Sequence, residues 1–221
     1  MSLHPESERQ QVLEMLRAGV NMPGQVPTYE EMPRRTLADK GACGPTAAHV
    51  IEEVHAPLNY AYISFTTGST AFQNVVGVMS TEIPDRIAAS LFAFEMAGIT
   101  SGSKGLVAYP PLVPVFPRSA LDELDIRIAY LRRSTRDAFL LAIMEEMPDF
   151  IVGESAFINY TLQDARKLGI AGCLPPVSSI FVAGTPMDLD LIPIAREILG
   201  ARVHDLYGCQ EFGWLTMDGI P

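Results

Sequence analysis

The sequence predicts an α/β fold, in which a mostly parallel sheet is covered by helices on both faces. Between Leu106 and Leu206, short apolar segments of strand length alternate with longer segments whose apolar residues recur at helical spacing. Strands and helices that alternate in this way pair in parallel through right-handed crossovers. The 221 residues, of which 48% are hydrophobic and 19% charged, are also enough for one large domain with a sizeable core.

We expect two parts along the chain, a helical and loop segment over residues 1–58 and the α/β region over residues 59–221. In the first part, an amphipathic helix is predicted to begin near Ser7, which can cap its N-terminus, and to end at Gly19. A second helix is predicted over Thr46–Val54, after a proline-rich loop.

The α/β region begins with two strands and continues as a regular alternation. Aromatic and β-branched residues predict strands over 60–65 and 75–79, and Pro84 opens a helix that Gly98 ends. Further strands are predicted over 106–109, 126–131, 150–152, 179–183 and 202–206, and helices over 119–124, 135–146, 156–168 and 189–199. Ligands of such sheets bind at the carboxyl ends of the strands, so the informative residues should directly follow them.

Composition and charge disfavour several classes of function. Lysine and arginine number 16 against 26 aspartates and glutamates, a net charge of −10, which is unsuited to nucleic acid or to an anionic membrane surface. No segment approaches the roughly 18–20 consecutive apolar residues of a membrane span. The three cysteines, Cys43, Cys173 and Cys209, are too widely spaced for a CxxC metal motif or a disulfide framework. We therefore expect a cytoplasmic protein.

A run of hydroxyl residues around a glycine follows the first strand of the α/β region. Hydroxyls and unobstructed backbone amides can wrap a polyphosphate, although an ordinary polar turn has the same composition. The residues of this loop are Thr66, Thr67, Gly68, Ser69 and Thr70.

Two further polar segments follow later strands. After the strand that ends at Ala183, a glycine would let a planar ring lie against the backbone, in the run Ala183, Gly184, Thr185 and Pro186. The last predicted strand ends within the run Asp205, Leu206, Tyr207, Gly208, Cys209, Gln210 and Glu211. Tyr207 can stack on a ring, and Glu211 can bind a hard cation such as Mg²⁺. Plain turns remain the alternative for each segment taken alone.

The order and placement of the three segments resemble the adenylate-forming superfamily, which comprises acyl-CoA synthetases, nonribosomal adenylation domains and luciferases, and in particular its phenylacetate–CoA ligase branch. In that family a Ser/Thr/Gly loop grips the phosphates of ATP, a Gly-x-Pro segment lies against adenine, and a D-x-Y-G-x-S/T-E segment follows. The likeness covers about Tyr60 to Pro221.

The resemblance implies a role for each segment, with ATP and Mg²⁺ as cofactors and CoA as a further candidate. It places Thr66 to Thr70 on the phosphates, Ala183 to Pro186 against the adenine, and Asp205, Tyr207 and Gly208 around the nucleotide. Tyr207 would stack on adenine and Glu211 would ligate Mg²⁺. The implied catalytic residues are Glu211, Gln210 and Thr66.

The sequence also departs from the family pattern. Ala71 replaces a glycine of the phosphate loop, Gln73 and Asn74 stand where proline and lysine are common, and Gln210 replaces a serine or threonine. The family's mobile C-terminal domain, with its catalytic lysine, would follow Pro221. We therefore interpret the chain as a fragment of a longer enzyme that lacks this domain.

The function implied by the resemblance is ATP-dependent activation of a carboxylic acid, followed by transfer to CoA or another acceptor. The branch implies an aromatic acid, such as the phenylacetate-like or phenazine carboxylate-like acids of antibiotic pathways, and a homodimer. The candidates to line its pocket are Phe65, Tyr109, Phe181, Phe212 and Trp214, and core positions are the alternative. A degenerate relative that binds the nucleotide or an aromatic acid without turnover is the second interpretation.

Two other groups of residues carry alternative chemistry. Ser155 lies between a predicted strand and helix, where a nucleophile elbow would be, and Asp188 or Asp190 with His204 would complete the chain order of a serine hydrolase. The basic cluster Arg132, Arg133 and Arg136 is suited to a CoA or phosphate group, with a solvated turn as the alternative. Cys209 is predicted to be a small buried residue rather than a reactive thiol.

Overall fold

The computed structural model describes residues 6–20, 60–65, 75–108, 115–210 and 212–221. The chain forms two compact units, the larger made of Met1–Met22 and Arg86–Pro221 and the smaller of Pro23–Asp85. The predicted helix over Thr46–Val54 lies outside the described residues.

The smaller unit contains an antiparallel pair of strands, as their aromatic and β-branched composition predicts. Strand β1 (Tyr60–Phe65) pairs with β2 (Val75–Met79). A short 3-10 helix, η2 (Ser80–Glu82), follows β2, and the Glu82 carboxylate accepts a hydrogen bond of 3.0 Å from the backbone N–H of Met79. The two strands predicted over 60–65 and 75–79 are confirmed.

The larger unit is built on a six-stranded sheet with the order β4-β3-β5-β6-β7-β8. The strands are β3 (Lys104–Val107), β4 (Arg127–Tyr130), β5 (Phe150–Gly153), β6 (Ser179–Ala183), β7 (Arg202–Cys209) and β8 (Gly213–Met217). Every neighbouring pair is parallel except β7 and β8. The predicted α/β class with a mostly parallel sheet is therefore confirmed.

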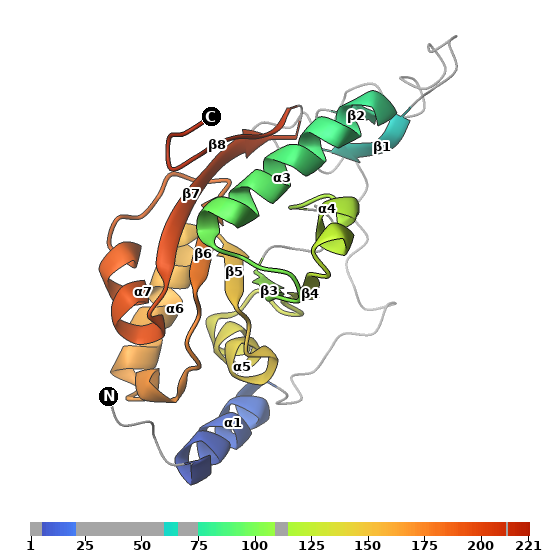
Figure 1. The fold of residues 1–221 in the computed structure, drawn as a ribbon. Helices are drawn as coiled ribbons and strands as arrows, with labels where there is room; N and C mark the ends of the chain where they lie inside the picture. Colours follow the sequence, from blue (N-terminus) through green and yellow to red (C-terminus); the bar gives the residue numbers. More distant parts are fainter. Residues whose placement is uncertain (1–5, 21–59, 66–74, 109–114, 211) are drawn as a thin grey trace, which may run out of the picture. The chain divides into compact units, whose positions relative to one another are not determined.

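Helices cover both faces of this sheet, as Figure 1 shows. They are α1 (Glu6–Val20), α3 (Ile83–Ala97), α4 (Arg118–Glu123), α5 (Arg136–Glu146), α6 (Ser155–Lys167), the 3-10 helix η3 (Ala171–Cys173) and α7 (Leu191–Leu199). None of the helices in the described ranges is both long and apolar enough to cross a membrane.

The alternation of side chains along the buried strands divides the core into two layers. Ile151, Ile180 and Val182 face α5, α6 and α7, and α1 packs on the outside of α5 through Leu16. Their sequence neighbours, such as Phe150 and Phe181, point to the opposite face and pack on α3. Continuous apolar strands of this kind are typical of parallel sheets that are covered on both sides.

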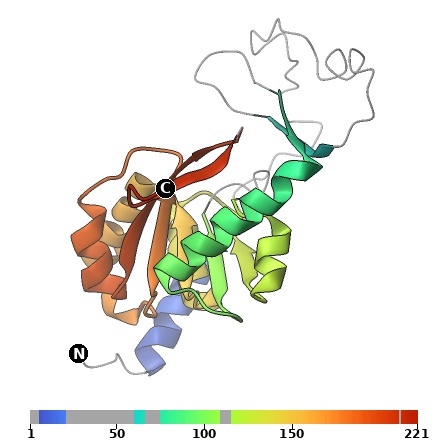
Figure 2. The same ribbon diagram turned by 45° about the horizontal axis from the view of Figure 1, so that its top comes forward.

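The last strand differs from the prediction. It was expected to end at Leu206, because the polar run that follows looks like a turn, but β7 continues to Cys209 and turns into the antiparallel strand β8. Figure 2 shows this hairpin at the edge of the sheet. Pairing with β8 satisfies the backbone of Tyr207–Cys209, and this explains why a polar sequence remains extended there.

Candidate functional site

The carboxyl ends of β5, β6 and β7 meet at one edge of the sheet. Gly153 pairs with Val182, and Ala183 pairs with Leu206, so the residues that follow these strands emerge side by side. Gly184 and Tyr207 come directly after the paired residues Ala183 and Leu206. The second and third segments singled out in the sequence therefore lie next to each other, although they are separated along the chain.

Tyr207 presents its ring at this edge. Along β7 the buried residues His204 and Leu206 alternate with Asp205, which is half-buried, and Tyr207, whose side chain is 65% exposed. Successive residues of a strand point to opposite faces, so Asp205 and Tyr207 share one face and His204 and Leu206 the other. An exposed phenol ring on a rigid strand is suited to stacking against a planar ligand.

Gly184 adopts a backbone conformation that other residues avoid. Its φ is +83°, and a side chain there would be strained. The glycine lets the chain turn sharply at the end of β6, and Thr185 and Pro186 then lie exposed. The turn accounts for the glycine without a ligand, and the exposed residues of this segment are accessible to one.

Buried side chains of α6 hold the loop that follows β6. The backbone N–H of Asp188 donates to Ser155 Oγ at 2.9 Å, and the Ser155 hydroxyl donates to the carbonyl of Pro186 at 3.1 Å. One turn further along α6, Asn159 Nδ2 donates to Asp188 Oδ2 at 2.6 Å. The loop is thus fixed through two backbone groups and one carboxylate.

These contacts are incompatible with the serine-hydrolase interpretation. The Ser155 side chain is buried and its hydroxyl is bonded to backbone, while Asp188 is bonded to Asn159 and to the N–H of Asp190. His204 points into the core instead, where its Nδ1 lies 2.8 Å from Asp218 Oδ2 and its ring contacts Phe181. The alternation of side chains along β7 buries His204, and the predicted triad does not assemble.

Close backbone approach and a buried arginine shape the β7–β8 hairpin. A Cβ atom on Gly208 would lie 2.3 Å from the carbonyl oxygen of Gly213 and 2.8 Å from the Trp214 ring, so only glycine fits. On the other side of the hairpin, Arg86 of α3 is 8% exposed and donates from Nη2 to the carbonyl of Gln210 at 3.1 Å. The backbone of Gln210, a predicted catalytic residue, is held by this contact.

Cys209 lies on the same hairpin and is exposed, so the prediction that it is buried is wrong. The reason is the extension of β7, which carries Cys209 to the end of the sheet opposite Gly213. Cys173, in contrast, is buried beneath α6.

The predicted phosphate loop Thr66–Thr70 and the predicted metal ligand Glu211 lie outside the described residues. In the ranges that are described, no three His, Cys, Asp or Glu side chains gather to form a metal site.

The aromatic residues considered for an acid pocket occupy different environments. Phe181 is completely buried in the core between the sheet and α3, and Trp214 donates its indole N–H to the carbonyl of Val115 at 3.0 Å. Phe212 is exposed at the hairpin. Phe181 is therefore a core residue and cannot line an acid pocket.

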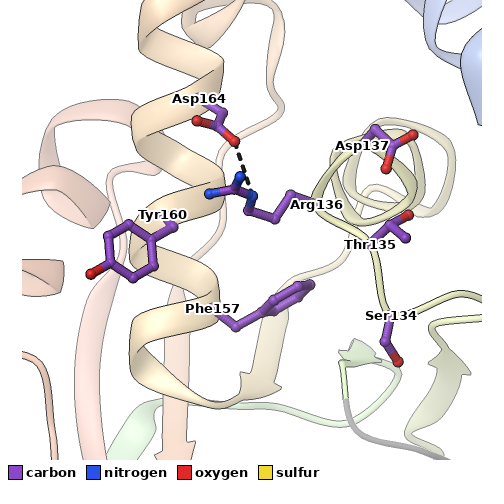
Figure 3. A pocket seen from close by; sticks show the side chains of 7 residues that line it. All are labelled: Ser134, Thr135, Arg136, Asp137, Phe157, Tyr160 and Asp164. Atoms are coloured by element: carbon purple, nitrogen blue, oxygen red, sulfur yellow. Dashed lines mark ion pairs between the residues drawn. The ribbon is translucent and has the colours of Figure 1, made fainter.

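A separate hollow of about 650 Å³ lies between the N-terminal turn of α5 and α6, as Figure 3 shows. Its polar wall includes Arg136, which forms an ion pair of 3.1 Å with Asp164, and Tyr160 stands at its rim. The hydrogen bond from Thr135 lowers the pKa of Asp137. Burial opposes this shift, while the backbone amides of Asp137 and Ala138 and the charge of Arg133 lower the pKa further. Arg132, Arg133 and Arg136 are all exposed, which fits both a solvated turn and a cluster that meets a CoA or phosphate group.

Sequence reasoning missed Arg86 and the pairing of Asn159 with Asp188. One signal was present for the second: Ser155, Asn159 and Gln163 recur at a spacing of four, which places polar side chains along one face of a helix. Nothing in the sequence around Arg86 distinguishes it from an exposed arginine in the first turn of a helix.

Comparison with known proteins gives one match in sequence and many in structure. The chain is 56% identical over 198 residues to an ACP-SH:acetate ligase of Malonomonas rubra, a match that covers 90% of this chain and 54% of the relative. The chain therefore spans about half the length of that protein. No family model matches the chain.

The solved structures share the fold at low sequence identity. An open conformation of 2-hydroxyisobutyryl-CoA ligase superposes with a TM-score of 0.57 at 15% identity, over 96% of this chain and 56% of the ligase. An amide bond synthetase of Marinactinospora thermotolerans gives 0.55 at 21%, over 73% and 32% of the two chains. The o-succinylbenzoate CoA synthetase of Bacillus subtilis gives 0.51 at 19%, over 72% and 32%.

These comparisons establish the fold as that of the N-terminal domain of adenylate-forming enzymes. They support the resemblance to that superfamily, while the sequence relative is an acetate ligase rather than a phenylacetate–CoA ligase. Neither comparison supports an aromatic acid.

Proposed function

We propose that this chain is part of an adenylate-forming ligase that activates a small carboxylic acid with ATP and transfers the acyl group to a protein-bound thiol. The observation that carries this proposal is the 56% identity to an ACP-SH:acetate ligase over 198 residues. The fold, and the meeting of Gly184 and Tyr207 at the carboxyl edge of the sheet, are consistent with it.

The proposed reaction has two steps. A carboxylate oxygen attacks the α-phosphorus of ATP, an oxygen–phosphorus bond forms, and pyrophosphate leaves with the electron pair of the broken bond. The thiol sulfur then attacks the acyl carbonyl, AMP leaves, and the thiol proton passes to solvent. No general base is needed in the first step, because a carboxylic acid is already ionised at neutral pH.

The residues at the sheet edge are suited to binding the nucleotide. Tyr207 offers an exposed ring for the adenine, and Thr185 and Pro186 lie exposed after the turn at Gly184. Gln210 and Glu211 would act on the α-phosphate, and Thr66–Thr70 on the outer phosphates. Mg²⁺, held by Glu211, would neutralise the negative charge that develops on the phosphate oxygens.

Acetate is the acid we propose, because the sequence relative is named for it. The same name supports a carrier-protein thiol as the acceptor in preference to CoA. An aromatic acid, which the phenylacetate branch would imply, is an alternative to be tested in the same assay.

The test is ATP–pyrophosphate exchange with the full-length protein and a panel of acetate, propionate, benzoate and phenylacetate, with Glu211→Ala as the control. We expect exchange with acetate, loss of exchange in the control, and a thioester on a carrier protein detected by mass spectrometry. Exchange with phenylacetate alone would replace the proposed acid. ATP binding without exchange would instead favour a non-catalytic relative.

A further inference from the structure

We propose that Ser155, Asn159 and Asp188 form a clamp that positions the Gly184–Pro186 segment for the base of the nucleotide. These three residues, called the α6 clamp here, are positioning residues that act through the loop backbone. The proposal rests on the proposed function, because the ligand of the segment is the ATP of that reaction.

The clamp joins two segments that are distant in the sequence. Ser155 bonds to backbone groups 31 and 33 residues away, at Pro186 and Asp188. Although Ser155 is the first residue of α6, its hydroxyl caps no backbone group of that helix, and the preceding Glu154 makes no side-chain cap either. A serine that served only its own helix would bond within it. The hydroxyl is instead committed to the loop after β6.

Each polar group of the clamp has a defined partner. Gln163 Nε2 donates to Asn159 Oδ1 at 3.0 Å, which turns the Asn159 amide so that its Nδ2 faces the Asp188 carboxylate. The other oxygen of Asp188 accepts the N–H of Asp190 at 3.1 Å. Asp188 therefore receives bonds on both oxygens, and its orientation is fixed from two sides.

Burial makes this arrangement selective for one loop conformation. Ser155 is 1% exposed and Asn159 is 2% exposed, so water cannot replace a partner that moves away. A buried polar group that loses its partner is costly, and the loop is therefore held in the conformation that satisfies all of them.

The clamp fixes one end of the segment, and the sheet fixes the other. Ala183 is paired with Leu206 in the sheet, Gly184 turns the chain with φ of +83°, and Pro186 is bonded to Ser155. Only three residues separate Gly184 from Asp188, and one of them, Pro186, is itself bonded to Ser155. A segment held at both ends is ordered before the nucleotide arrives, and preorganisation of this kind raises affinity by removing the entropy cost of ordering.

Exchanging the two side chains of the Asn159–Asp188 pair tests the clamp. Asn159→Asp alone places two carboxylates face to face, and Asp188→Asn alone places two amide groups face to face. The double variant N159D/D188N can restore every hydrogen bond: Asp at 159 accepts from Gln163 and from Asn at 188, whose carbonyl oxygen accepts from Asp190. We expect each single variant to raise the KM for ATP about tenfold or more, and the double variant to return within about threefold of the wild type.

A pair of hydroxyl deletions provides a matched control. Thr161 is buried like Ser155, but its hydroxyl donates to the Phe157 carbonyl within α6 at 2.8 Å. Ser155→Ala should raise the KM for ATP with kcat at saturating ATP nearly unchanged, whereas Thr161→Val should lower the melting temperature without changing the KM. If the charge variants fail to fold, this pair decides the question.

The outcomes separate the clamp from the function on which it rests. Wild-type exchange together with an unchanged KM for ATP in folded Ser155→Ala and in the single pair variants would overturn the clamp and leave the proposed function standing. A double variant as weak as the single variants would also overturn it. A wild-type protein that neither binds ATP nor exchanges pyrophosphate would overturn the proposed function, and the clamp with it.

Discussion

Two neighbouring segments at the carboxyl edge of the sheet are held in place by different means. The loop after β6 is anchored by buried side chains of α6 that bond to Pro186 and Asp188. The β7–β8 hairpin is anchored by backbone pairing, by the close approach of Gly208 to Gly213, and by one cation from α3. The two segments adjoin in space and together carry most of the described residues of the proposed nucleotide site.

This difference predicts which substitutions each segment tolerates. The loop depends on the hydrogen-bonding pattern of its partners, so a pair of side chains can be exchanged if donors and acceptors still match. The hairpin depends on the absence of a side chain, and no exchange can compensate for an added Cβ. If the proposed function is correct, the loop should govern ATP affinity together with Tyr207 of β7. The turn of the hairpin, which carries Gln210 and leads to Glu211, should govern the chemical step.

Gly208→Ala should have the largest effect on both stability and pyrophosphate exchange. The new Cβ would meet the Gly213 carbonyl at 2.3 Å and Trp214 Cα at 3.0 Å, and these backbone atoms cannot move without separating β7 from β8. Overpacking of this kind costs about 1–3 kcal/mol, and we expect the upper end of that range. Urea denaturation would measure the loss in the free energy of unfolding, and pyrophosphate exchange should fall more than about tenfold.

Gly219→Ala is the matched control for that variant. Gly219 has φ of +78°, and nothing lies within 4 Å of the position of its Cβ, so the substitution introduces backbone strain without a collision. Such strain costs about 1–2 kcal/mol. Equal losses in the two variants would contradict the view that close approach holds the hairpin.

Arg86→Met should separate the hairpin from the loop in kinetic terms. Methionine keeps much of the apolar packing but removes the donor to the Gln210 carbonyl, a loss of about 1–3 kcal/mol in stability. Because Gln210 and Glu211 are proposed to act on the α-phosphate, we expect kcat for pyrophosphate exchange to fall about tenfold, with a smaller change in the KM for ATP. Arg86→Lys keeps the charge and a donor, so its kcat should lie between that of Arg86→Met and that of the wild type. A rise in KM with unchanged kcat would instead assign Arg86 to nucleotide binding.

The sequence predicted the body of the sheet better than this edge. Apolar strands such as Phe150–Gly153 and Ser179–Ala183 are buried on both faces, and their composition alone identifies them. The continuation of β7 beyond Leu206 was missed, because it depends on a partner strand that begins only at Gly213. Local composition at Tyr207 and Gly208 cannot reveal that pairing.

The positions of the candidate site residues were predictable only in part. The rule that ligands bind near the carboxyl ends of strands singles out Gly184, which follows β6, and the register of β6 and β7 places Tyr207 beside it. The position of Ser155 between a strand and a helix predicts a nucleophile, which the structure does not support. Its actual partners, Pro186 and Asp188, belong to another strand–helix connection, and a sequence does not state which loop a hydroxyl will meet.

Gly184→Ala should have a moderate effect that resembles loss of the clamp. A φ of +83° strains alanine by about 1–2 kcal/mol, and the loop can relieve this strain only by changing the path of Thr185 and Pro186. We expect a raised KM for ATP and a small change in kcat, measured by pyrophosphate exchange. An effect on kcat alone would contradict the division of labour between loop and hairpin.

Thr135→Ala should have the smallest effect on pyrophosphate exchange. Thr135 lies at the same edge of the sheet as the loop and the hairpin, but at a third place that is separate from both. The Thr135 hydroxyl bonds to the Asp137 carboxylate and holds the pKa of that carboxyl below its ordinary value, so its removal should raise this pKa. A carboxyl whose pKa is lower in the folded state stabilises the fold at neutral pH, and this contribution is lost as the pH falls through the folded pKa. The difference between variant and wild type should therefore be present at neutral pH and shrink in acid. An NMR titration of the Asp137 carboxyl measures the shift directly.

The same variant tests how far the nucleotide site extends along the sheet. Thr135 follows β4, and β3 and β5 separate that strand from β6. The KM for ATP should consequently remain at the wild-type value while the Asp137 titration moves. A change in KM of more than about threefold would mean that the hollow between α5 and α6 is coupled to the loop after β6. Helix α6, which carries Ser155 and Asn159 of the clamp as well as Tyr160, is the element that would transmit it.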